Sequence, residues 1–175
     1  MKKTFFLSIF YLIIIHSFGQ NSLPSRNVAL VYSFSIKEEI APPAWRVTQK
    51  SINEAQMLKA DCIVLHMNTY GGLVDAADSI RTKILNCPIP VYVFIDDNAA
   101  SAGALIALAC DKIYMRKGGK IGAATVVNAT GEAMPDKYQA YMRATMRATA
   151  ESHGKDTIVK GNDTKIGRAS CRERV

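Results

Sequence analysis

The stretch VYVFIDDNAASAGALIALA, residues 91–109, passes from β-forming residues through a small-residue turn into an apolar, helix-forming segment. Its first part, residues 91–96, is predicted to be a buried strand, and residues 100–109 a short helix. At the start of this helix, Ser101 is the only residue in the run 99–104 that carries a functional group. Either the small residues let the helix pack closely on a sheet, or they let a substrate approach the hydroxyl.

The same alternation of strand and helix extends through most of the chain. Short apolar or alternating segments predict strands, and segments with apolar residues at helical spacing predict helices. Strands are predicted at 28–36, 61–68 and 112–115, and helices at 44–60, 73–85 and 135–153. Strands that alternate with helices predict an α/β fold, with a largely parallel sheet and flanking helices.

A second turn rich in small residues follows the predicted strand 61–68, where Gly71 and Gly72 lie side by side. The carboxyl ends of parallel strands meet at one edge of a sheet, so this turn and Ser101 are expected to be neighbours. Glycine amides without a side chain, and the first amides of a helix, can hold an oxyanion. Taken singly, however, Ser101 could be a helix cap and the glycines a tight turn.

The two ends of the chain differ from its middle. Two lysines, an apolar run and small residues before Gln20 predict a signal peptide over residues 1–19. An uncleaved anchor is the alternative. Residues 20–165 are expected to form one domain. Residues 166–175 have no apolar face and resemble a translated sequencing adapter, so we expect an artefactual tail, with a basic disordered tail as the alternative.

Composition excludes several classes of function. The formal net charge is +7, but part of it comes from the two ends, and no basic stripe with aromatic residues points to nucleic acid. Among the four cysteines, Cys62 and Cys110 lie in apolar segments and are expected to be free thiols. No spacing of cysteine, histidine or acidic residues indicates a metal site, and no cofactor is expected.

Three stretches together resemble a known family: HMNTYGGLVDAADSIRTKI, IPVYVFIDDNAASAGALIALACDKIYM and GGKIGAATVV. Over about residues 28–160 the chain resembles the NfeD-type membrane-bound serine proteases, which are similar in fold to the Clp protease subunit within the ClpP/crotonase-like superfamily. The resemblance implies that Ser101 is the nucleophile. It also implies that the turn at Gly71 and Gly72, together with Ala102, forms the oxyanion hole.

The resemblance implies that a lysine, not a histidine, activates the serine. Lys137, near the start of the predicted helix 135–153, is the best candidate for this base; a solvated surface lysine is the alternative. Arg147 occupies the place where one type of family member carries its lysine, and an arginine cannot act as a base. His66 lies in an apolar strand and His153 at a helix end, so neither is favoured.

The leading hypothesis is an exported, membrane-associated serine endopeptidase that cleaves apolar peptide segments through a Ser–Lys dyad. Tyr70 replaces the proline of the family's glycine turn and, with Leu73, is expected to line the substrate groove. The resemblance implies a membrane-protein or peptide substrate and a homo-oligomer. A catalytically inactive scaffold that binds peptides is one alternative. A crotonase-like acyl-CoA enzyme is another, but export argues against it.

Overall fold

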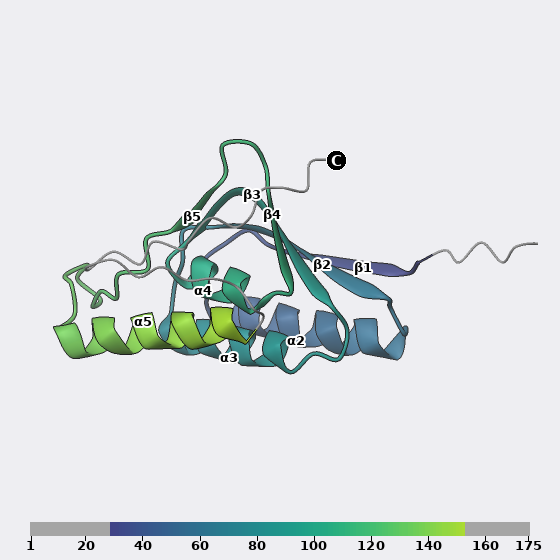
Figure 1. The fold of residues 1–175 in the computed structure, drawn as a ribbon, viewed down its shortest axis with the longest axis horizontal. Coiled ribbons are helices and arrows are strands. Elements are labelled where there is room, and N and C mark those ends of the chain that lie inside the picture. Colours follow the sequence, from purple (N-terminus) through teal and green to yellow (C-terminus); the bar gives the residue numbers. More distant parts are fainter. Residues whose placement is uncertain (1–28, 153–175) are drawn as a thin grey trace, which may run out of the picture.

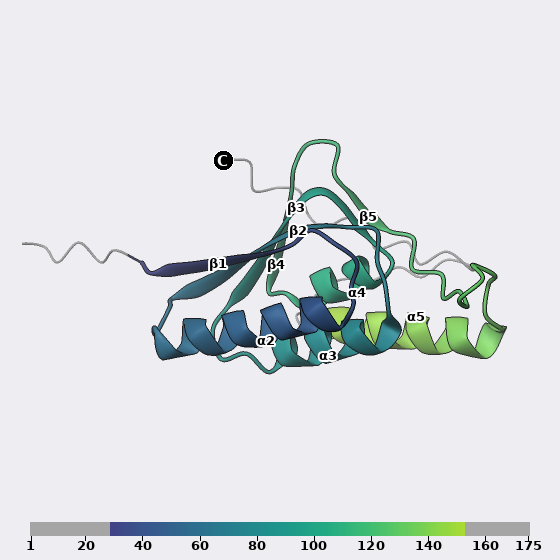
Figure 2. The same cartoon turned by 180° about the vertical axis from the view of Figure 1, so that it is seen from behind.

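The structure, a computed structural model, describes residues 29–152 of the chain. The predicted signal peptide, the predicted tail, Cys171 and His153 lie outside the described residues. A parallel sheet forms one layer and the helices form the other (Figures 1 and 2). Among the described residues, no helix combines the length and apolar character needed to cross a membrane.

The sheet has the order β1-β2-β3-β4, and β5 pairs with β3 beyond the end of β4. All pairings between these strands are parallel, in agreement with the largely parallel sheet that the sequence predicts. The strands are β1 (Val31–Ile36), β2 (Cys62–Thr69), β3 (Val91–Ala100), β4 (Lys112–Met115) and β5 (Lys120–Gly122). Helices α2 (Pro42–Met57), α3 (Val74–Leu85), α4 (Ala102–Ala109) and α5 (Asp136–Glu151) complete the described part.

The helices lie on one face of the sheet, as both ribbon views show. In β2, Ile63, Leu65 and Met67 are buried while the residues between them are half-exposed. Successive side chains of a strand point to opposite faces, so β2 buries one face only. From the short apolar run 61–68 alone, a buried central strand is expected. The short apolar run hid the one-sided burial because Val64 on the other face is apolar too.

Helix α4 is the centre of the core. All eight of its residues are buried, in agreement with a sequence that is apolar all round. It contacts β3 above and both α3 and α5 below (Figure 1). Its N-terminal end, and with it Ser101, is therefore fixed from several sides.

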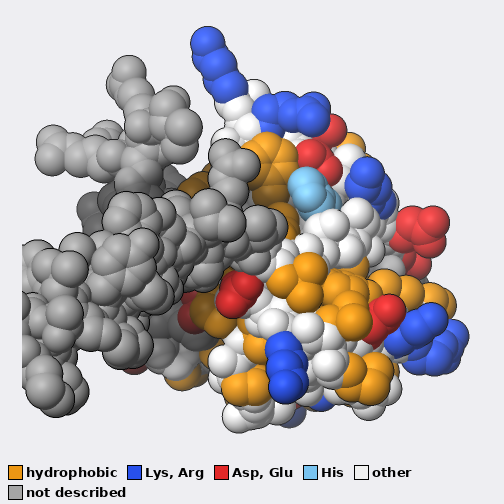
Figure 3. Space-filling model, turned by 90° about the vertical axis from the view of Figure 1, so that its right-hand side faces the viewer, with side chains coloured by type: hydrophobic (Ala, Val, Ile, Leu, Met, Phe, Trp, Pro, Cys, Tyr) orange, Lys and Arg blue, Asp and Glu red, His pale blue; other side chains and the backbone are white. Residues whose placement is uncertain are grey.

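The opposite face of the sheet carries half-exposed aromatic side chains. His66 lies against Phe94, with ring centroids 5.8 Å apart, and Tyr92 meets Tyr114 edge-on. On the face drawn in Figure 3, hydrophobic side chains lie among both acidic and basic ones. Cys62 and Cys87 are free thiols, as expected for Cys62, and burial raises the pKa of Cys87. The thiol of Cys110 is buried and donates to Ile106 O at 3.5 Å.

Strand β5 was not predicted. The sequence favours a loop over residues 116–124, because a strand of three residues is too short to show alternation. The strand forms because β3 changes partner: residues 92–95 pair with β4, and residues 98–100 pair with β5. The register shifts where β3 bends, and the amide of Asn98 there donates to the side chain of Asn68.

Candidate active site

Ser101 lies between the end of β3 and the start of α4, with φ 52° and ψ −116°. This conformation is rare for a residue with a side chain and costs about 1–3 kcal/mol. The backbone around it holds it in place. The Ser101 N–H donates to Gly122 O at 2.7 Å, and its carbonyl accepts from the Ala104 N–H at 3.0 Å. A strained turn between strand and helix is a known way to present a nucleophile.

The hydroxyl of Ser101 does not cap the helix. It occupies the capping position of α4 but makes no side-chain hydrogen bond there. The alternative explanation of Ser101 as an ordinary helix cap therefore does not fit its geometry. Within residues 29–152, the N–H of Ala102 also has no acceptor, as expected for the first residue of a helix.

The Gly71–Gly72 turn passes directly beside Ser101. Gly71 has φ +114°, and a Cβ added to it would lie 2.6 Å from Ser101 Cβ and 3.1 Å from Ser101 Oγ. No side chain fits between them. The structure thus brings together the two segments that the sequence analysis expected to be neighbours.

Hydrogen bonds from the segment before α2 hold this turn. The Ile40 N–H donates to Gly71 O at 2.8 Å, and the Leu73 N–H donates to Ile40 O at 2.7 Å. The Gly71 N–H donates to the Thr69 hydroxyl at 3.1 Å. Among the turn's amides, that of Gly72 has no acceptor in the described part of the chain. Gly72, rather than Gly71, therefore offers a hydrogen to a ligand.

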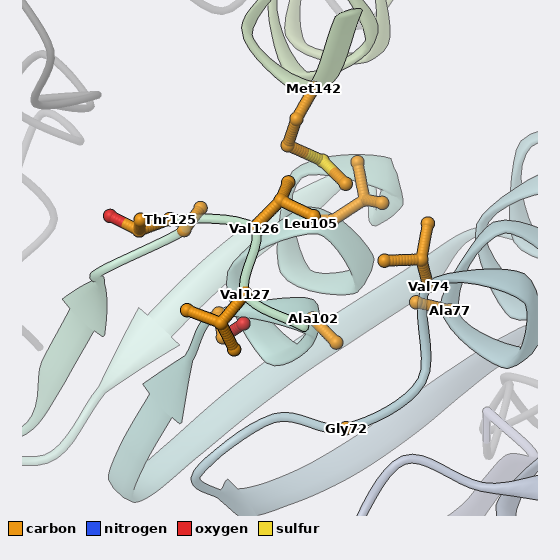
Figure 4. Close-up of a pocket in the computed structure, with 11 residues that line it drawn as sticks. Gly72, Val74, Ala77, Ala102, Leu105, Thr125, Val126, Val127 and Met142 are labelled. Carbon is orange, nitrogen blue, oxygen red and sulfur yellow. The ribbon is translucent and has the colours of Figure 1, made fainter. Parts of the chain in front are cut away.

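Gly72, Ser101 and Ala102 line one pocket, and apolar side chains form most of its remaining wall (Figure 4). They come from α3, α4, α5 and the segment after β5, so four parts of the chain close around the serine. The other lining residues are Val74, Ala77, Leu105, Ala124, Thr125, Val126, Val127 and Met142.

Lys137 lies in the first turn of α5, outside this pocket lining. It is exposed, and its ammonium group lies 5.1 Å from the centroid of the Tyr138 ring. The same helix supplies Met142 to the pocket. Arg147 is exposed on α5, whereas His66 points to the sheet face opposite the helices. Lys137 therefore lies on a helix that contributes to the pocket, but outside the lining that includes Ser101.

Tyr70 and Leu73 flank the glycine turn. Their exposed fractions are 82% and 54%, so both side chains are available to a ligand. Tyr70 lines a second, open groove, which also includes Glu38 and Gly72 and thus adjoins the pocket at Ser101. Within the described residues, no three His, Cys, Asp or Glu side chains gather as a metal site would require.

The residues that hold the glycine turn in place could not be found from the sequence. Thr69 and Ile40 contact it through hydrogen bonds, but nothing in their local sequence indicates this. Val126 and Val127 end the stretch GGKIGAATVV, and both line the pocket. The family resemblance implies no role for these two valines. Met142 could have been found only as one of several apolar residues at helical spacing.

Comparison with known proteins shows the family of the chain. The family model described as NfeD1b, N-terminal domain, matches residues 30–163. Membrane protein NfeD1b of Bacillus subtilis is 36% identical over 126 residues, covering 72% of this chain and 29% of the relative. Membrane-bound protease PH1510 of Pyrococcus horikoshii is 29% identical over 138 residues, covering 74% of this chain and 31% of the relative. The chain thus spans less than a third of the length of these relatives.

Solved structures show the same fold. A mutant of the 1510-N membrane-bound stomatin-specific protease, with a serine changed to alanine, matches with a TM-score of 0.68 and 29% identity, covering 73% of this chain and 66% of the other. A lysine-to-alanine mutant in complex with a substrate peptide gives 0.67 and 29%, with coverages of 70% and 60%. ClpP1 from Listeria monocytogenes, at 18% identity, TM-score 0.58 and coverages of 75% and 84%, shares the fold. The chain belongs to the family of the NfeD1b N-terminal domain.

Proposed function

We propose that this chain is the protease part of an exported, membrane-associated serine endopeptidase. The observation that carries the proposal is the geometry of Ser101. Its hydroxyl makes no capping hydrogen bond and lies beside the glycine turn. Gly72 and Ala102, whose amides have no acceptor in the described part of the chain, line the same pocket as Ser101. Two amide donors beside one nucleophilic oxygen are the arrangement that acyl transfer uses, and a base completes it. The protease names of the PH1510 relatives support the same reaction.

In the proposed reaction, Ser101 Oγ bonds to the carbonyl carbon of a peptide and gives its proton to a base. The carbonyl oxygen becomes an oxyanion, which the Gly72 and Ala102 amides stabilise. The base passes the proton to the leaving nitrogen, and the peptide bond breaks. Water then hydrolyses the acyl ester and restores Ser101. Loss of one such donor typically slows catalysis about 100- to 1,000-fold.

We propose Lys137 as the base. Among the solved relatives, a lysine mutant holds a substrate peptide, which supports a lysine near the reaction centre of that protein. Arg147 cannot accept a proton at neutral pH, and His66 faces away. The Lys137 side chain has a flexible four-carbon stem and lies about one and a half turns before Met142 on the same helix. To reach Ser101, the Lys137 ammonium group would move away from the Tyr138 ring.

Labelling with a fluorophosphonate tests the dyad in the full chain. We expect labelling at Ser101, and Lys137→Ala should slow it about 100-fold or more, since general base catalysis contributes about 10²–10⁴-fold. Lys50→Ala, which removes an exposed lysine from α2, is the control. Equal labelling of Lys137→Ala and the control would place the base elsewhere. A folded wild-type protein that takes no label would favour the inactive scaffold.

The pocket walls favour an apolar side chain beside the cleaved bond. Val127 is 52% exposed and lines the pocket. With a peptidyl ester of leucine, Val127→Asp should lower kcat/KM about 10-fold, because a charge would replace roughly 1.4 kcal/mol of apolar contact. Val47→Asp changes a valine of α2 with 46% exposure outside the pocket and should leave kcat/KM unchanged. An equal effect of both changes would contradict an apolar subsite here.

The names of the relatives support a proposal for the substrate class and the location. Since the 1510-N protein is named membrane-bound and stomatin-specific, we propose that the substrate here is an apolar segment of a membrane protein of the stomatin type. Such a segment would lie extended along Tyr70 and Leu73, both exposed beside the turn. A homo-oligomer anchored at the outer side of a membrane is proposed for the intact protein.

A further inference from the structure

Thr69 is a buried polar residue at the end of β2, with 2% exposure. Its hydroxyl donates to Glu38 O at 2.7 Å and accepts from the Gly71 N–H at 3.1 Å. A contact of 3.4 Å to Gly71 O is longer, and the single hydroxyl hydrogen serves the Glu38 carbonyl. The side chain therefore ties the glycine turn to the segment before α2.

The methyl group of Thr69 contacts the other half of the site. A Cβ added to Gly103 would lie 2.6 Å from Thr69 Cγ2, so this methyl group lies against the first turn of α4. That turn carries Ala102, and Ser101 directly precedes it. One buried side chain thus contacts both segments that bear the proposed oxyanion donors.

We propose that Thr69 is a positioning residue that sets the Gly72 amide at the correct distance from Ser101; this rests on the proposed function. Because the Gly71 amide is bonded to Thr69, the turn presents only the Gly72 amide toward the pocket. The methyl group fixes how closely the turn approaches α4. Thr69 is buried and lies outside the lining of the Ser101 pocket, although it contributes to the wall of the second groove beside Tyr70. It therefore acts on Ser101 through Gly71 and Gly103.

Two substitutions separate the two contacts. Thr69→Val keeps the branched shape and loses the hydroxyl, which leaves the buried Gly71 amide and the Glu38 carbonyl without their partner. Thr69→Ser keeps the hydroxyl and loses the methyl group. Thr48→Val is the matched control, because Thr48 is fully buried in α2 and its hydroxyl also donates to a backbone carbonyl, that of Ala44.

The experiment measures kcat and KM of the full chain with a peptidyl ester of leucine, and the melting temperature of each variant. We expect Thr69→Val to lower kcat about 10- to 100-fold, since a misplaced donor costs up to about 10²-fold, with KM changed less than about threefold. Thr69→Ser should restore kcat to within about fivefold of wild type. Thr48→Val should keep the wild-type kcat although it also loses a buried hydroxyl.

Wild-type kcat in Thr69→Val, or a loss equal to that in Thr48→Val, would overturn the inference while Ser101-dependent turnover stands. If the wild type shows no such turnover, the proposed function fails instead. Hydrogen exchange then still tests Thr69, because Thr69→Val should speed exchange of the Gly71 amide at least about tenfold and Thr69→Ser should not. Unchanged exchange in Thr69→Val would overturn the inference by itself.

Discussion

Ser101→Ala is expected to lower kcat for a peptidyl ester of leucine at least about 10⁴-fold, the scale seen when the nucleophile of a serine protease is removed. The change deletes one oxygen atom from a site where that oxygen makes no capping hydrogen bond. The backbone bonds of Ser101 to Gly122 and Ala104 remain, because they use main-chain atoms only. The fold should therefore stay intact while turnover disappears.

The melting temperature of Ser101→Ala should lie within a few degrees of wild type, because the conformation at φ 52° is equally strained for alanine. Ser79→Ala is the matched control: Ser79 is an exposed serine of α3 whose hydroxyl donates to the Asp75 carbonyl. The control should turn over substrate at the wild-type rate. Residual turnover of Ser101→Ala above about a tenth of wild type would rule out Ser101 as the nucleophile.

The second large effect is expected for Gly71→Ala. Its new Cβ would lie 2.6 Å from Ser101 Cβ, and Gly71 has φ +114°, a conformation that side chains rarely adopt. Strain of about 1–3 kcal/mol adds to an overpacking cost of about 1–3 kcal/mol. The turn must move away from Ser101 to relieve the collision, so the Gly72 amide moves as well. We expect fluorophosphonate labelling to slow about 100-fold or more.

Gly118→Ala separates strain from collision. Gly118 has φ +89°, and a Cβ added there would meet nothing within 4 Å. This control should lower the free energy of unfolding by the strain alone and leave labelling unchanged. Chemical denaturation and labelling rates of both variants provide the comparison. Equal labelling of Gly71→Ala and Gly118→Ala would show that close contact between the glycine turn and Ser101 is not needed.

The local sequence predicts those elements of the fold whose residues show a clear hydrophobic pattern. Helix α4 could be predicted because its segment is apolar along its whole length, and such a helix belongs in the core. The approach of Gly71 to Ser101 could be predicted from parallel strand ends, since the two residues follow β2 and β3, which are neighbours in the sheet. These predictions need only the period of the sequence and the handedness of strand connections.

Contacts between distant segments could not be predicted in the same way. Ile40 pairs with Gly72 across 32 positions, and the Thr69 hydroxyl reaches the Glu38 carbonyl. Strand β5 exists only because β3 bends to meet it. The place of Lys137 also depends on the path of the segment between β5 and α5. Each of these positions depends on hydrogen bonds or side-chain contacts between segments that are far apart in the sequence. Such contacts leave no periodic pattern in the local sequence.

A crystal structure of the protein bound to a peptide boronate is the most direct test of a single reaction centre built from Ser101 and two amides. We predict a covalent bond from Ser101 Oγ to boron, with one boronate oxygen within about 3.1 Å of both the Gly72 and Ala102 nitrogens. The peptide's apolar side chain should enter the pocket beside Met142. A boronate oxygen bonded to neither amide, or an unmodified Ser101 under saturating boronate, would contradict the account.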